Sequence, residues 1–376
     1  MRATFSLYPW DVEGDPRSAG VLRDLGVERV ALAATYHAAR VATPRHPDRR
    51  IVELPHSASY VAAPTPLPRG EFSFERARDA LEAVGIVVDP WVVVNHLDGA
   101  APDVPRVVTA FGDRVGHAAC LSQAATRRYV TDLLGAVLPL AQGGRVVLEA
   151  VGWQGLGHGS AHDKLLGADF TARDVELLSL CLCDACLTAA GLGGSARAVV
   201  RAGVGAVTAA AGEPGIAPAV ERGTAAGSRQ DGDLAAVLGA LRAARRATLA
   251  AVRRDAFDAA ARAGIAEVRL SRSDADGDPA AEGVLVDCWG DVDAAVGRFD
   301  GLGRPGGLDG APATRVGYVE VLARDLAGLD DDWRRLAAAG ADELHVYHAG
   351  LASTPRVERA VRAAAAIDVG PRADRA

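Results

Sequence analysis

The sequence predicts a (β/α)8 barrel of the TIM-barrel class, an α/β fold. Three observations predict it: eight short apolar segments rich in Val, Ile and Leu, helical patterns between them, and polar residues where the apolar segments end. A chain of 376 residues is long enough to form such a barrel as one domain. A doubly wound open sheet is the main alternative, but PWDVEGDP follows the first apolar segment instead of a glycine-rich phosphate-binding turn.

We expect the apolar segments to be buried parallel strands, since each is hydrophobic along most of its length. They comprise residues 3–8, 28–33, 86–94, 145–151, 267–271, 284–289, 315–322 and 343–348. Helical patterns cover residues 18–26, 73–85, 126–141, 170–191, 233–264, 291–302, 330–340 and 354–366. Several of these patterns end in glycine, which is typical of helix C-termini.

Residues 1–365 are expected to form a single barrel domain with one insertion. The interval from about 190 to 245, between the fourth and fifth strands, is rich in Ala and Gly and longer than one crossover needs. We interpret it as an inserted helical pair with a mobile loop. Residues 366–376 read as a disordered tail.

Composition argues against several classes of partner. The net charge is −7, and no basic stripe interleaves with aromatic residues, so nucleic acid is not an expected partner. No apolar run reaches membrane-spanning length, and the N-terminus lacks the charged and apolar regions of a signal peptide. We therefore expect a cytoplasmic protein without a membrane partner. A homo-oligomer is compatible with the sequence.

Three cysteines lie within six residues, Cys181, Cys183 and Cys186. This spacing lets three sulfurs converge on one ion but is too cramped for good disulfides among them. A tetrahedral zinc site needs a fourth ligand, and Cys120 is the best candidate of the two remaining cysteines, Cys120 and Cys288. A reducing compartment also favours metal binding over disulfides. The alternative is that these cysteines are small apolar residues buried on a helix.

Two glutamates are the candidate catalytic residues. Glu149 ends the fourth expected strand and Glu320 the seventh, and these positions face each other across the mouth of an eight-stranded barrel. A glycosidase needs such a pair, about 5 Å apart for retention and about 6.5–9.5 Å for inversion, and the sequence leaves both outcomes open. Asp287 or Asp11 could instead be the second carboxylate, and Glu149 could form an ion pair with a neighbouring arginine.

Other polar and aromatic residues follow the expected strands and are candidates for substrate binding. Aromatic faces stack on sugar rings while polar side chains bond the hydroxyls, so this lining favours a small carbohydrate substrate. The candidates are Trp10, Asp11, His37, Asn95, His96, Trp153, Asp287, Trp289 and Tyr347.

The loop HGSAHDK adds His158, His162 and Lys164, the only lysine of the sequence. These side chains could clamp an anionic group of the substrate, such as a uronate or phosphate, and the two histidines could bind a second metal. A desolvated lysine could also form a Schiff base with a sugar carbonyl, as in an aldolase or isomerase. A solvated loop with incidental histidines is the simplest alternative.

The spacing of Cys120, Ser122 and Arg127, together with the later CLCDAC segment, resembles the zinc site of the family-42 β-galactosidases and related clan A glycoside hydrolases. The resemblance covers about residues 100–190. It implies a structural zinc held by four thiolates beside the barrel, at Cys120 and the three clustered cysteines.

The same resemblance implies that Glu149 is the acid/base and Glu320 the nucleophile. Leu148 stands where the clan usually has Asn, and about thirty residues separate Glu149 from Cys181, more than that family has. We therefore expect a divergent glycosidase-like enzyme whose substrate differs from simple β-galactosides. A barrel that has lost this Asn could instead bind a carbohydrate without catalysis.

Overall fold

The computed structural model describes residues 1–157, 168–205, 226–271, 283–300 and 314–367. The chain divides into two compact units. The barrel unit comprises Met1–Val94, Thr131–Val151 and Ala256–Ala376, and the second unit comprises Asn95–Val130 and Gly152–Asp255. Each unit is described by itself below.

Eight parallel strands form a ring in the barrel unit. Each strand pairs with the next in chain order, and the last, β13, pairs with the first, β1. The ring strands are β1 (Arg2–Leu7), β2 (Arg29–Tyr36), β6 (Val87–Val93), β9 (Arg145–Glu149), β10 (Glu267–Ser271), β11 (Gly283–Asp287), β12 (Thr314–Glu320) and β13 (Glu343–Tyr347). Each of the eight expected strands overlaps one of them. The predicted (β/α)8 barrel class is therefore confirmed.

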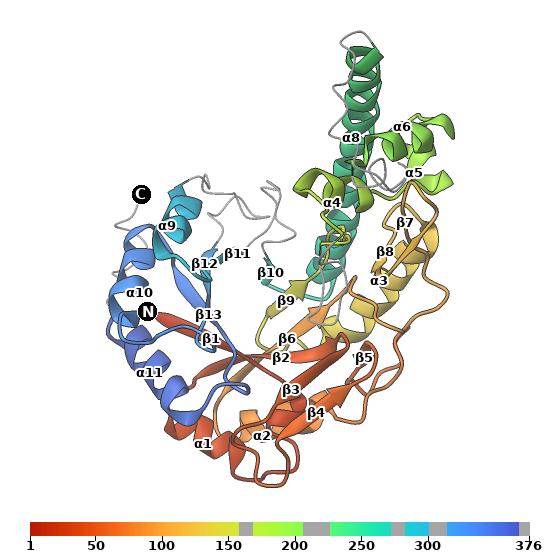
Figure 1. Cartoon of the computed structure of the whole chain (residues 1–376). Coiled ribbons are helices and arrows are strands. Elements are labelled where there is room, and N and C mark those ends of the chain that lie inside the picture. The colour runs from red at the N-terminus through yellow and green to blue at the C-terminus, as the bar shows by residue number, and fades with distance from the viewer. Residues whose placement is uncertain (158–167, 206–225, 272–282, 301–313, 368–376) are drawn as a thin grey trace. The chain divides into compact units, whose positions relative to one another are not determined.

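Helices connect the strands (Figure 1). They are α1 (Ser18–Asp24), α2 (Phe74–Ala83), α3 (Ala124–Val137), α8 (Ala226–Arg262), α9 (Val292–Asp300), α10 (Leu329–Ala338) and α11 (Thr354–Ala365), with 3-10 turns η1 (Pro9–Asp11) and η2 (Leu138–Leu140). The sequence of α10 shows why these segments are helical. Trp333 and Leu336 recur at helical spacing and are buried, while three aspartates in the first turn and Arg335 in the last turn complement the helix dipole.

Short antiparallel segments interrupt this alternation. β3 (Ala39–Ala42) and β4 (Ile51–Leu54) form a hairpin after β2, and β5 (Ala58–Ser59) pairs with the end of β2. None of these strands was expected from the sequence. They are too short to show a clear alternation of apolar and polar residues.

Buried charges fill the N-terminal end of the ring. Arg145 donates to Glu267 at 2.7 Å, and Arg269 donates to Glu267 at 2.8 Å and to Glu343. Asp89 accepts from Arg29 at 2.6 Å. Although burial alone would raise it, the charges of Arg269 and Arg145 hold the pKa of the Glu343 carboxyl below its ordinary value. The network joins β9 to the neighbouring β10 and also β10 to β13 across the ring, so it links strands that do not pair with each other.

One histidine lies between this network and the opposite end of the ring. His345 Nε2 is 2.8 Å from Ser6 Oγ, and burial lowers the pKa of His345 to about 3. The histidine is therefore neutral at ordinary pH.

The second unit contains a hairpin of β7 (Arg106–Val108) and β8 (Arg114–Ala119), with helices α4 (Ala172–Leu178), α5 (Asp184–Ala189) and α6 (Ser195–Gly203). The single helix predicted over 170–191 was wrong, because the structure has two helices there, separated by non-helical residues between α4 and α5. Ser179 accepts a bond from Leu156 N at 2.9 Å, and Cys183 has extended backbone with φ −65° and ψ 164°. Of the predicted insertion, α6 and the start of α8 are described, whereas residues 206–225 lie outside the described residues. Of the predicted tail over 366–376, residues 366 and 367 are described and the rest lie outside.

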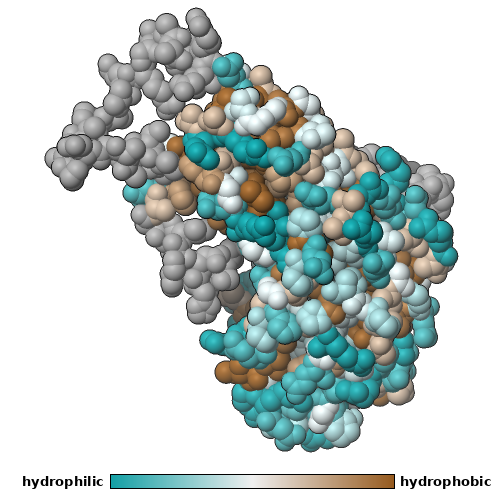
Figure 2. Space-filling model, turned by 90° about the vertical axis from the view of Figure 1, so that its right-hand side faces the viewer, coloured by the Kyte–Doolittle hydropathy of each residue, from teal (hydrophilic) through white to brown (hydrophobic). Residues whose placement is uncertain are grey.

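Polar side chains predominate on the face of the molecule drawn in Figure 2, and apolar ones form scattered patches. Within the described ranges, none of the helices combines the length and hydropathy needed to cross a bilayer. The large hydrophobic side chains that are well exposed among the described residues are Val21, Ile51, Val87 and Trp289.

Candidate active site at the barrel mouth

Glu149 ends β9 at the C-terminal end of the ring, where an indole holds it. Trp91 Nε1, from β6, donates to Glu149 Oε2 at 2.8 Å. The Trp91 ring is itself fixed by buried aromatic neighbours, with its centroid 5.8 Å from that of Tyr8 and 5.2 Å from that of Tyr36. The packing of Trp91 against these tyrosines therefore fixes the position of the N–H group that donates to Glu149.

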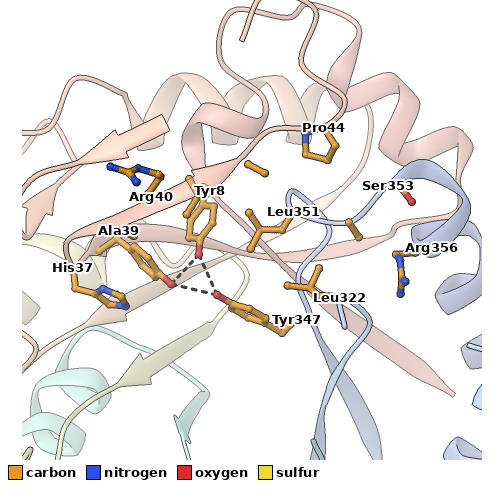
Figure 3. Close-up of a pocket in the computed structure, with 14 residues that line it drawn as sticks. Tyr8, His37, Ala39, Arg40, Pro44, Leu322, Tyr347, Leu351, Ser353 and Arg356 are labelled. Atoms are coloured by element: carbon orange, nitrogen blue, oxygen red, sulfur yellow. Dashed lines mark hydrogen bonds between the residues drawn. The ribbon is translucent and has the colours of Figure 1, made fainter. Parts of the chain in front are cut away.

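Three tyrosine hydroxyls form a triangle beside this pair (Figure 3). The Tyr8 hydroxyl donates to Tyr36 at 2.8 Å, and the Tyr347 hydroxyl is 3.3 Å from Tyr8 and 3.4 Å from Tyr36. Burial raises the pKa of Tyr36 well above its ordinary value, and the nearby Tyr347 and Glu149 raise it further. Burial likewise raises the pKa of Tyr8. These phenols are therefore neutral hydrogen-bonding groups.

Glu320 ends β12, and its carboxylate turns back to its own chain. Oε2 accepts from Leu322 N at 2.6 Å and from Ala323 N at 3.0 Å, and the side chain is buried. Glu320 lies beside Tyr347 in the register of β12 and β13. The two N–H donors fix this carboxylate at the C-terminal end of its strand.

Asp287 ends β11, and Trp289 follows it at the same end of the ring. The Asp287 carboxylate accepts from Trp289 N at 3.0 Å, and the Trp289 side chain is 41% exposed. The Trp289 ring centroid lies 5.4 Å from that of Tyr318 and 5.2 Å from that of Tyr347. Trp289 therefore presents an accessible aromatic ring beside two half-buried ones, as a sugar-stacking residue would.

Trp10 and Asp11 lie in the core instead of on an open surface. Trp10 is fully buried and stacks on Tyr8. The Asp11 carboxylate accepts from Tyr8 N at 2.9 Å, and burial raises the pKa of Asp11 to about 7. A Cβ at Gly350 would overlap this carboxylate, so only glycine allows the chain after β13 to approach it.

A pocket of about 620 Å³ adjoins the tyrosine triangle. Its lining includes two of the predicted binding residues, His37 and Tyr347. The side chains that line it come from the end of the ring, from β3 and from the loops after β12 and β13, and Arg40 and Arg356 lie on its wall. All of these residues belong to the barrel unit.

Asn95, His96 and Trp153 belong to the second unit. Asn95 is buried and donates to Gly152 O at 3.4 Å, and His96 Nε2 lies 2.9 Å from Asp98 Oδ2. Trp153 Nε1 donates to Arg245 O at 3.2 Å. The predicted binding residues His158, His162 and Lys164 lie outside the described residues.

All four predicted metal ligands meet in the second unit. Cys120, which follows β8, lies with its sulfur 3.6 Å from those of Cys181 and Cys183 and 3.5 Å from that of Cys186. The four sulfurs lie within 4.8 Å of one another. Sulfurs at the corners of a zinc tetrahedron are about 3.8 Å apart, because each Zn–S bond is about 2.3 Å. The cluster could therefore hold a metal ion.

Neighbouring groups also suit a thiolate cluster. Val108 N donates to Cys181 at 3.4 Å and Gln123 Nε2 to Cys183 at 3.5 Å, while Ser122 Oγ lies 3.4 Å from the Cys186 sulfur. Such N–H···S contacts orient metal-binding thiolates and stabilise their charge.

The list of candidate site residues drawn from the sequence omitted Trp91 and Tyr318. Both read as ordinary strand residues within apolar runs. The alternation of side chains along a strand could have identified Trp91. Residues two apart lie on the same face of a strand, and Trp91 lies two residues before Val93, which pairs with Glu149 in the register of β6 and β9.

These observations define a (β/α)8 barrel with carboxylates and aromatic rings at the C-terminal end of its strands. A solved structure with this fold is the glycoside hydrolase domain of PgaB (BpsB) from Bordetella bronchiseptica, with a TM-score of 0.53 and 14% identity over 98% of this chain and 100% of that one. The match shows that this chain shares the fold of that domain.

Two further solved structures are more distant. The exo-β-N-acetylglucosaminidase of Vibrio harveyi has a TM-score of 0.44 and 10% identity, covering 96% of this chain and 54% of that one. A β-N-acetylhexosaminidase has the same TM-score and identity, covering 96% of this chain and 71% of that one. No family model and no curated protein sequence matches the chain.

Proposed function

We propose that the protein is a glycoside hydrolase that cleaves a small carbohydrate or glycoconjugate with two carboxylates. Glu149 is the acid/base and Glu320 the nucleophile or general base. The observation that carries the proposal is that the two glutamates end the fourth and seventh strands of a parallel ring, β9 and β12, among aromatic side chains. The fold shared with a glycoside hydrolase domain supports the same reaction class.

The hydrogen bond from Trp91 suits an acid/base role for Glu149. An indole N–H only donates, so Oε2 acts as the acceptor and a proton on Glu149 resides on Oε1. That proton can be given to the oxygen of the leaving group and recovered from water in a later step. Trp91 fixes the carboxylate in one orientation throughout the cycle.

The backbone contacts of Glu320 suit the second role. The two N–H groups that bind Oε2 hold the carboxylate in place without neutralising it with a cation. A fixed carboxylate can attack the anomeric carbon in a retaining mechanism or activate water in an inverting one. Asp287 is the alternative second carboxylate, since it lies at the end of the adjacent strand β11.

The sugar stacks on Trp289 in this proposal. Its indole is partly exposed at the same end of the ring as Asp287 and Tyr347, which can bond sugar hydroxyls. Tyr318 lies behind the indole and keeps it in place.

We also propose that Cys120, Cys181, Cys183 and Cys186 hold a structural zinc, as in the family-42 β-galactosidases that the motif resembles. Four thiolates fill the tetrahedron and leave no position for water or substrate, so the ion stabilises the second unit and takes no part in the reaction. It would link the end of β8 to the start of α5.

The test is hydrolysis of a panel of aryl glycosides by the wild type, Glu149→Gln, Glu320→Gln and Asp287→Asn. Either glutamate substitution should lower kcat at least about 100-fold while ligand binding persists. Glu358→Gln, on the partly exposed helix α11, is the matched control and should retain full activity. A wild type that binds sugars but hydrolyses none would support a non-catalytic carbohydrate-binding barrel instead.

A further inference from the structure

Away from the tyrosine triangle, the pocket in Figure 3 is lined by alkyl side chains together with His37, Arg40, Ser353 and Arg356. Alkyl side chains belong to half of the 14 lining residues, among them Val41, Pro44, Leu322 and Leu351. We propose that this pocket binds an uncharged, apolar aglycone, so that the substrate is an aryl or alkyl glycoside. The inference rests on the proposed hydrolase function and names the substrate class of the same site.

The charged groups of the pocket wall do not require an anionic ligand. The guanidinium of Arg40 donates to Glu53 at 2.6 Å. The guanidinium of Arg356 donates to Val321 O at 2.8 Å and to Arg324 O at 3.1 Å. Both cations are therefore already engaged with acceptors of the protein, and an incoming carboxylate or phosphate would have to compete with them.

The three tyrosine hydroxyls lie together on one side of the pocket (Figure 3). Tyr8, Tyr36 and Tyr347 bond one another at 2.8 to 3.4 Å, so each hydroxyl has a partner inside the triangle. Two of these tyrosines also lie near the Trp91 indole that donates to Glu149. The centroid of the Trp91 ring is 5.2 Å from that of Tyr36 and 6.5 Å from that of Tyr347. The pocket thus shares a wall with the barrel mouth.

The polar barrel mouth suits the sugar of a glycoside, and the alkyl side chains of the pocket suit its aglycone. Each hydroxyl of a sugar ring needs a hydrogen-bonding partner, which alkyl side chains cannot supply. Glu149, Asp287 and Glu320 supply such partners at the ends of their strands. The acid must reach the oxygen between sugar and leaving group, so the leaving group continues from the mouth into neighbouring space. A volume of about 620 Å³ is typical of pockets for small organic ligands.

The test uses 2-naphthol, an uncharged aryl aglycone, titrated by calorimetry into the full-length protein. Ala42→Trp and Ser353→Trp each add a bulky side chain at an exposed position of the pocket wall. Val21→Trp is the matched control, because Val21 is equally accessible on α1 and lies outside the lining. We expect saturable binding by the wild type, weakened at least about tenfold by both pocket variants and unchanged in the control.

A second probe and a second variant separate the alternatives. 2-Naphthoate, the anionic analogue, should bind more weakly than 2-naphthol, and 1-octanol should compete with 2-naphthol if alkyl aglycones also fit. Glu149→Gln should bind 2-naphthol like the wild type while losing turnover. If no glycoside is hydrolysed but 2-naphthol binds as described, the apolar site stands and the catalytic proposal fails. Absence of saturable binding, equal binding in the pocket variants, or tighter binding of 2-naphthoate would each overturn the inference.

Discussion

Trp91 and Glu149, which lie on neighbouring strands, are joined by a hydrogen bond of 2.8 Å from the indole N–H to the carboxylate. The indole is buried and packed against tyrosines, so it cannot swing away without disturbing the whole aromatic cluster. Trp91 is therefore a positioning residue for Glu149.

Trp91→Phe should lower kcat about tenfold, because a hydrogen bond to a charged group contributes about 1.5–3 kcal/mol and part of that orients the carboxylate. KM should change little. Steady-state kinetics on the best aryl glycoside measures both constants. Trp289→Phe is the comparison and should mainly raise KM, since its exposed ring contacts substrate in the proposal. An unchanged kcat in Trp91→Phe would show that the bond is not used.

Cys183→Ser should lose bound zinc, because it removes one of four converging sulfurs. Elemental analysis of the purified protein measures the metal content. Cys288→Ser is the matched control, since Cys288 is buried in the barrel unit and bonds Val286 O instead of the cluster. Equal zinc in the wild type and Cys183→Ser would refute the metal site.

Arg269→Met should destabilise the barrel unit by about 3–5 kcal/mol, because it leaves Glu343 buried with one of its cations removed. Urea unfolding followed by circular dichroism measures the change in free energy. Arg334→Met breaks the exposed pair with Asp331 and should change the stability by less than about 1 kcal/mol. Similar losses in both variants would contradict a special role for the buried network.

Asp11→Asn should remove a pH dependence of stability. The pKa of Asp11 is about 7 in the folded protein because of burial, partly offset by Tyr8 N, Arg45 and Arg49, and near 3.8 in the unfolded chain. Between those values the folded state retains a proton that the unfolded state releases, so the contribution of Asp11 to stability falls as pH rises from about 4 to 7. Above pH 7 the contribution is constant.

The free energy of unfolding of Asp11→Asn relative to the wild type should therefore increase from pH 4 to 7, by up to about 4 kcal/mol. Urea titrations of both proteins at four pH values measure this difference, in which the other titrating groups cancel. A difference that does not vary with pH would contradict a buried, proton-binding Asp11.

The strand ring was predictable because parallel strands buried on both faces are continuous apolar runs, as in residues 86–94 and 145–151. The cysteine cluster was predictable because three of its sulfurs are neighbours in sequence. Cys120 could be added because it was one of only two others.

The detailed lining of the mouth was less accessible to sequence reasoning. Trp10 and Trp289 both follow strands, yet one is fully buried and the other is 41% exposed. The difference depends on which rings from distant segments pack against each indole, and such packing has no local signature. The part of the pocket wall that β3 supplies was also not predictable, because the β3–β4 hairpin is too short to show a clear alternation of apolar and polar residues.

The most direct test of the central claim compares 2,4-dinitrophenyl and alkyl glycosides of the same sugar as substrates of Glu149→Gln. A dinitrophenolate leaves without protonation, whereas an alkoxide requires the general acid. We predict that kcat/KM, which reports the step in which the glycosidic bond breaks, falls at least about 100-fold for the alkyl glycoside and far less for the dinitrophenyl glycoside. Equal losses for both substrates, or no loss, would contradict the role of Glu149 as the acid.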